Sequence, residues 1–140
     1  MKPGYGCLES VEINFQPRCD DNTLSPNSAL HVWWRELAEA THMAYKPLSL
    51  PQAGPMLQTL GYTDIRHEVI RLPCNPAWPT LPHEREIGRW CSVGMERGLQ
   101  ALTLGPLHRV KHWTKQQVDD LVNAVHKQLS SRQCHVYFEM

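Results

Sequence analysis

The feature that most constrains this chain is a strand-like stretch near its amino terminus, Val11 to Phe15. Apolar and polar residues alternate there with a period of two, which is typical of a half-buried β-strand. The preceding Lys2-Pro3-Gly4, followed by Gly6, is typical of a turn. No other strand-like stretch comes earlier, so its pairing partners must come from later in the sequence. One edge of this strand is therefore expected to be bare, and bare edges recruit partners.

Apolar periodicity and turn residues divide the rest of the 140-residue chain into alternating helices and strands. We expect five helices and two further strands, in the order β, α, α, β, α, α, α, β when the first strand is counted. The expected helices cover Pro26–Tyr45, Pro51–Leu60, Leu81–Gly98, Leu99–Val110 and Lys115–Leu129, and the later strands cover Thr63–Leu72 and Cys134–Met140.

Local signals set the ends of these helices. Pro47 is expected to stop the first helix and Gly61 the second. Glycines at 88, 94 and 98 each cost roughly 1 kcal/mol relative to alanine inside a helix, so a break is expected near Gly98. Thr114 with Gln117 three residues later matches a capping box, which predicts the start of the last helix.

Several short motifs, in order, resemble the fungal secondary-metabolism methyltransferases that use S-adenosylmethionine (SAM). Lys2-Pro3-Gly4-Tyr5-Gly6 leading into Val11-Glu12 looks like the "LKPGG…VE" turn and fifth strand of that family. The remaining matches are Cys19–Leu24 with the "DDGTL" loop, Leu60–Ile65 with the "AGFVDV" step, Leu72-Pro73, Trp78-Pro79 and Glu86–Trp90 with the "LP…WP…EIGRW" region, and His135–Phe138 with the last strand.

The resemblance covers nearly all of the chain but only the C-terminal, substrate-side half of the family's fold. It implies a single truncated methyltransferase-like domain over residues 1–140, an α/β (α+β) remnant of the class I methyltransferase fold. The implied sheet is small, mixed and three-stranded, with the last strand between the first and third and about five helices packed on it. No glycine-rich turn of the G-x-G-x-x-G kind occurs in the sequence, so we expect no cofactor, SAM included.

The composition indicates which kinds of partner and which cellular compartment to expect for the protein. The formal net charge is zero, which favours neither nucleic acid nor an anionic membrane surface. There is no long apolar run, and the five cysteines include no C-x-x-C pair, which together indicate a cytoplasmic protein with reduced thiols. His108 and His112 have metal-ligand spacing but no third ligand, so no metal is expected. Cys91 lies in no recognisable nucleophile motif.

The aromatic residues are the best candidates for a binding site. In the family, the segments that carry them border the substrate pocket. We expect Arg89, His42 or Tyr45 to donate a hydrogen bond to a substrate carbonyl. The expected substrate-binding residues are Trp33, Trp34, Trp78, Trp90 and Met95. The alternative for each tryptophan is ordinary core packing, since large aromatics dominate protein cores.

Three functions compete. The first is a cofactor-free cyclase of the pericyclase or Diels–Alderase kind, which would fold a hydrophobic terpenoid or polyketide into a reactive shape. The second is a non-catalytic methyltransferase-like binding or regulatory subunit, which would pair with a methyltransferase at the bare strand edge. The third is an isomerase, dehydratase or hydrolase with His or Glu as acid–base. The first is our main expectation, together with a homodimer formed through the first strand or its flanking helices.

Overall fold

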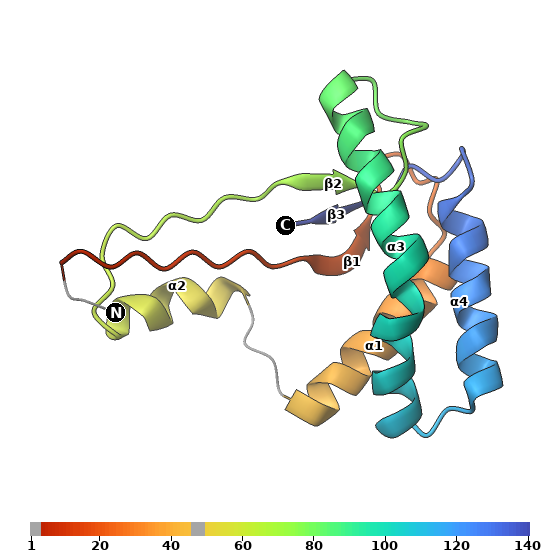
Figure 1. Ribbon diagram of the computed structural model, residues 1–140, viewed down its shortest axis with the longest axis horizontal. Coiled ribbons are helices and arrows are strands. Elements are labelled where there is room, and N and C mark those ends of the chain that lie inside the picture. The colour runs from red at the N-terminus through yellow and green to blue at the C-terminus, as the bar shows by residue number, and fades with distance from the viewer. Residues whose placement is uncertain (1–3, 46–49) are drawn as a thin grey trace.

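The computed structural model describes residues 4–45 and 50–140, without the side chains of residues 50 and 51. It contains three strands and four helices within these ranges (Figure 1). Their bounds are β1 (Asn14–Arg18), α1 (Ala29–Tyr45), α2 (Leu50–Thr59), β2 (Arg71–Pro73), α3 (Pro82–Arg109), α4 (Lys115–Leu129) and β3 (Tyr137–Glu139). The α/β class is confirmed, with four helices described in place of the five expected.

The three strands form one sheet in the order β1-β3-β2. The last strand therefore lies in the middle, as the resemblance implied. Both β1 and β2 run antiparallel to β3, and Glu139 is paired with Asn14 on one side and with Arg71 on the other. The expectation of a mixed sheet is wrong, because both hydrogen-bonded strand pairs are antiparallel. The strands β1 and β2 run in the same direction, but β3 lies between them.

The strands are shorter than the sequence pattern suggested. Most of the expected strand Thr63–Leu72 is extended backbone without a ladder, and β2 begins only at Arg71. Ile70 adds one last pair, since its backbone N–H and C=O both bond to Met140 at 2.8 and 2.9 Å. Likewise, β1 begins at Asn14 rather than Val11. The alternation shows that these residues can pair, but pairing also requires a neighbouring strand.

Helix α3 is continuous over 28 residues, so the expected break near Gly98 is wrong. Its buried residues Met95, Leu99, Thr103 and Leu107 recur every four residues on both sides of that glycine. This apolar stripe packs against α1 and α4 along its length. Burying one leucine is worth roughly 1.5–3 kcal/mol, which outweighs the cost of about 1 kcal/mol for a helical glycine.

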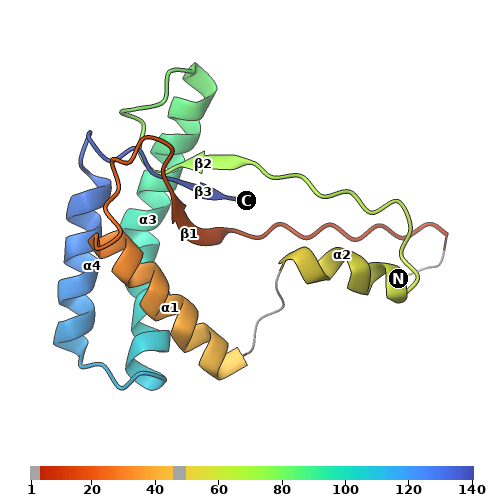
Figure 2. The same cartoon turned by 180° about the vertical axis from the view of Figure 1, so that it is seen from behind.

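The core lies where α1, α3 and α4 meet the sheet. Trp33 of α1 is fully buried, and its indole N–H donates to Thr103 Oγ1 at 2.8 Å. The Phe15 ring lies edge-on to both Trp33 and Phe138, with centroids 5.8 and 5.5 Å apart. Figure 2 shows the three helices gathered at one end of the molecule. Thr114 caps α4 with the predicted capping box.

The chain thus has two regions, which we call the body and the arm. The body consists of residues 14–45 and 71–140, with the sheet and helices α1, α3 and α4. The arm consists of residues 4–13 and 52–70, including most of α2, and it projects away from the helices (Figure 1). Within the described residues, α2 packs against no other helix or strand. Gly61 follows α2 with a φ of +88°, as expected of a helix stop, whereas Pro47 lies outside the described residues. No helix of the described ranges has the length and apolar content to cross a membrane.

Candidate functional site

The eight residues predicted for a site lie on two helices, α1 and α3, and one loop. Trp33 belongs to the core, and Trp34 packs partly buried against it. His42 and Tyr45 lie exposed at the carboxyl end of α1. Neither residue lines the hollow between α3 and α4 that is described below.

The predicted residues on α3 face different directions. Arg89 is exposed and pairs with Glu86 at 3.0 Å, and the side chain of Trp90 is 69% exposed. Met95, in contrast, is only 5% exposed and lies on the side facing α4. Trp78, in the loop before α3, stacks on His135 with ring centroids 5.8 Å apart, and its indole N–H is buried with no acceptor among the described residues.

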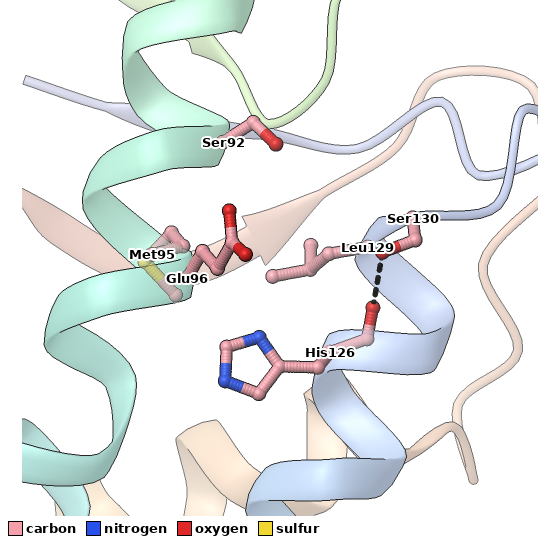
Figure 3. A pocket seen from close by; sticks show the side chains of 6 residues that line it. All are labelled: Ser92, Met95, Glu96, His126, Leu129 and Ser130. Carbon is pink, nitrogen blue, oxygen red and sulfur yellow. Dashed lines mark hydrogen bonds between the residues drawn. The ribbon is translucent and has the colours of Figure 1, made fainter.

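Met95 is the one predicted residue that lines the hollow between α3 and α4 (Figure 3). This open hollow measures about 320 Å³. Its floor is apolar, from Met95 and Leu129, and its rim is polar. The rim carries Ser92 and Glu96 from α3, with His126 and Ser130 from α4 and its end. Apart from Met95, none of these residues was predicted from the sequence, although Ser92–Glu96 and His126–Ser130 each have the four-residue spacing that places two side chains on one helical face.

The rim of this hollow does not assemble an acid–base relay. The His126 imidazole and the Glu96 carboxylate approach from opposite helices (Figure 3). In the described part of the chain, no hydrogen bond links this ring to Glu96 or to a serine hydroxyl. Ser130 Oγ instead donates to the backbone oxygen of His126 at 2.9 Å. The arrangement suits the binding of a small group with an apolar and a polar end, rather than hydrolysis.

A second polar cluster ties the loop after β1 to the sheet. The Asp21 carboxylate accepts from Thr23 Oγ1 at 2.8 Å and from Cys19 Sγ at 3.1 Å, and it pairs with His135. The hydrogen bonds from Cys19, His135 and Thr23 hold the pKa of Asp21 well below its usual range.

Asp20, the neighbouring carboxylate, completes this cluster. It accepts from the Tyr137 hydroxyl and from Arg71, each at 2.9 Å. The Arg71 guanidinium also lies over the Tyr137 ring, 4.7 Å from its centroid. Both acidic residues are thereby engaged by the sheet, so the cluster fixes a loop and leaves neither carboxylate free for a ligand.

The arm carries the largest gathering of exposed apolar side chains. Eight large apolar residues of the arm are between 44% and 89% exposed. They are Tyr5, Leu8, Val11, Ile13, Met56, Leu60, Val69 and Ile70. Apolar exposure on this scale marks an interaction surface more often than a solvated face. It is also the part of the molecule where extended backbone is available for strand pairing.

Comparison with known proteins identifies the chain's relatives as methyltransferase-related proteins of fungal secondary metabolism. It is 45% identical over 139 residues to "Secondary metabolism regulator LAE1" of Cochliobolus heterostrophus. It is 37% and 33% identical to "Protein-methionine methyltransferase laeA" of Chaetomium globosum and of Emericella nidulans, respectively. These matches cover 98% of this chain but 45%, 43% and 36% of the three relatives, so the chain spans less than half of their length. No family model matches, and no solved structure gives a significant match.

The relatives confirm the resemblance to fungal secondary-metabolism methyltransferases and overturn the main functional expectation. The cofactor-free cyclase, and with it the expected C–C bond-forming enzyme, is wrong, because the relatives are named as regulators and methyltransferases. Their names favour the alternative of a methyltransferase-like regulatory role. The eight predicted residues stay predictions as ligand-binding residues, but their roles in a cyclisation fall with that function.

Proposed function

We propose that this chain is a methyltransferase-like binding module in the regulation of fungal secondary metabolism, which acts by pairing with another protein. The observation that carries the proposal is the arm, where eight exposed apolar side chains lie beside extended backbone, of which residues 6–13 belong to no strand ladder in the described part of the chain. The names of the relatives support a role in regulation, because these relatives match nearly the whole of this chain.

The partner we propose is a cofactor-binding methyltransferase half-fold, which carries the glycine-rich turn that this sequence lacks. In the family, the fourth strand lies beside the strand that β1 resembles. A partner strand at the outer edge of β1 would continue the sheet, and residues 4–13 would lengthen the pairing. The charges of the arm favour a basic partner surface there, since Glu9, Glu12, Asp64 and Glu68 outnumber the single cation Arg66 in the two extended segments.

A second copy of the chain is the other candidate for the same edge. Two β1 strands related by a twofold axis would pair edge to edge, and the homodimer would bury part of both arms. A small hydrophobic metabolite is a candidate ligand for the hollow between α3 and α4, where Met95 and Leu129 offer an apolar floor.

The test mixes this chain with the separately expressed cofactor-binding portion of the Cochliobolus heterostrophus relative. Size-exclusion chromatography with light scattering should show a one-to-one complex. The Val11→Lys variant, which places a charge on the exposed arm, should bind at least about tenfold more weakly. Asn123→Lys adds the same charge to an exposed position of α4 and serves as the matched control, with unchanged affinity.

Calorimetry with SAM separates the two halves of the proposal. The chain alone should give no binding heat, whereas the complex should bind SAM through the partner's glycine-rich turn. The proposal is contradicted if the chain alone binds SAM. It is also contradicted if the chain is strictly monomeric and does not bind the cofactor-binding half-fold. A homodimer that Val11→Lys dissociates supports the second candidate instead.

A further inference from the structure

Four of the five cysteines converge inside the body, although they come from four separate segments. Cys19 follows β1, Cys74 follows β2, Cys91 belongs to α3, and Cys134 precedes β3. All four are free thiols. The Cys74 and Cys91 side chains lie close enough to shift each other's pKa, and Cys91 packs against the buried cluster that contains Cys74. Cys134 is near enough to Cys74 to act on it electrostatically. The fifth cysteine, Cys7, lies exposed on the arm.

Close packing of α3 on the end of β2 holds the Cys91 and Cys74 thiols near each other. A Cβ atom at Gly88 would lie 2.7 Å from the backbone oxygen of Asn75, so only glycine allows this approach. Cys91 lies about one turn after Gly88 on the same side of α3, and Cys74 directly precedes Asn75. The helix α3 therefore places Cys91 beside Cys74.

Asn75 fixes the strand side of this contact. Its side chain is 5% exposed, and its amide Nδ2 donates to the backbone oxygens of Leu129, Ser131 and Cys134 at 3.3, 3.3 and 3.0 Å. Its Oδ1 accepts from the backbone N–H of Ala77 at 3.0 Å. A buried amide satisfied in this way leaves the adjacent Cys74 little freedom to move.

The two thiols differ in reactivity. Burial raises the pKa of Cys74, which is fully buried, and the hydrogen bond with Cys91 raises it further. That same hydrogen bond lowers the pKa of Cys91, which is only partly buried. The thiolate is the nucleophilic form of cysteine, so Cys91 is the thiol that reacts first and Cys74 is the one placed to follow.

We propose that Cys91 and Cys74 form an oxidation site, at which hydrogen peroxide joins α3 to the end of β2 by a disulfide. The Cys91 thiolate attacks one peroxide oxygen, the O–O bond breaks, and the hydroxide released takes up a proton to become water. Cys91 is now a sulfenic acid. The Cys74 sulfur gives up its proton and attacks the Cys91 sulfur, the S–O bond breaks, and a second water leaves. Two thiols are oxidised by two electrons, and one peroxide is reduced to two waters.

The neighbouring cysteines provide internal competitors. Burial raises the pKa of Cys134 to about 11, so this thiol contributes little thiolate at neutral pH. Cys7 is exposed and free to react with peroxide, but it lies outside the cluster. A specific site therefore means that Cys91 is sulfenylated and then linked to Cys74, whatever happens at Cys7.

Peptide mapping tests the site, because each cysteine lies on its own tryptic peptide. The folded chain is treated with hydrogen peroxide, denatured, alkylated and digested without reductant. Mass spectrometry should find residues 72–85 linked to residues 90–97, and dithiothreitol should abolish this link. In Cys74→Ser, a dimedone adduct should persist at Cys91, because no second thiol resolves the sulfenic acid.

Cys134→Ser is the matched control and should retain the link between Cys74 and Cys91. A disulfide from Cys74 to Cys134 overturns the proposal, and so does oxidation confined to Cys7. Because the cross-link is measured in the unmodified chain, a variant that fails to fold does not weaken the test. The site needs no partner protein, so its outcome is independent of the proposed binding function.

Discussion

The body and the arm are made of similar residues but place them differently. Among the residues that the structure describes, all sixteen buried hydrophobic residues belong to the body, whereas eight of the fourteen exposed large hydrophobic residues belong to the arm. In the body, three helices meet a sheet, so each apolar face finds another to pack against. In the arm, α2 and two extended segments carry the same kinds of side chain, but α2 packs against no other helix or strand of the described ranges. The apolar pattern of an element thus determines which of its faces can be buried. Whether that face is buried depends on the elements that lie next to it.

The largest expected effect compares one leucine from each region. Leu99 of α3 is fully buried, whereas Leu60 of the arm is 64% exposed. Leu99→Ala should lower the free energy of unfolding by roughly 2–5 kcal/mol, because it removes buried methyl groups and leaves a cavity. Leu60→Ala should change it by less than about 0.5 kcal/mol. Urea denaturation measures both, and comparable losses would show that the arm is packed after all.

Two glycines of α3 offer a smaller effect with opposite signs. Gly88→Ala should cost roughly 1–3 kcal/mol, because the new Cβ would meet the Asn75 backbone at 2.7 Å. Gly94 has no neighbouring atom within 4 Å of a Cβ, so Gly94→Ala should stabilise the helix by up to about 1 kcal/mol. Thermal unfolding followed by circular dichroism resolves the difference. Equal effects at both positions would contradict the close approach of α3 to the end of β2.

Lowering the pH tests the hydrogen bonds by which the loop after β1 is held against the residues of β3 and its preceding segment. Because the folded pKa of Asp21 is below its unfolded value of about 3.9, the ionised carboxylate stabilises the fold above that pH. This contribution should be lost as the pH falls below about 4. Asp21→Asn should therefore reduce the fall in the urea midpoint on acidification, whereas Glu9→Gln on the arm should leave the fall as it is. An unchanged pH dependence in Asp21→Asn would show that the carboxylate is not held as described.

Much of the body could be predicted from the sequence. The apolar stripe of α1, the capping box of Thr114 and Gln117 and the central position of the last strand were all expected and are present. The continuity of α3 was not predictable from glycine propensity alone, because the outcome depends on what the helix packs against. The lengths of β1 and β2 depend in the same way on the strand between them.

The candidate sites were less predictable than the fold. Aromatic content drew attention to Trp33, for which the sequence left core packing as the alternative; the structure buries its side chain and bonds its indole N–H to Thr103, while a binding role stays a prediction. The hollow between α3 and α4 and the thiol pair of Cys74 and Cys91 arise from contacts between segments far apart in sequence. The spacing of residues within one segment does not indicate which distant segments will contact it. Such contacts can therefore be identified only in the folded structure.

Hydrogen exchange followed by mass spectrometry tests the contrast between body and arm most directly. The account predicts that, in the chain alone at low micromolar concentration, amides of residues 6–13 and 63–69 exchange within seconds, while those of α3 and α4 stay protected. Addition of the cofactor-binding half-fold should then protect residues 6–13 and leave α3 and α4 unchanged. An arm that is already protected in a monomeric chain, or that gains no protection from the half-fold or from self-association, would contradict the claim that the arm is a binding surface.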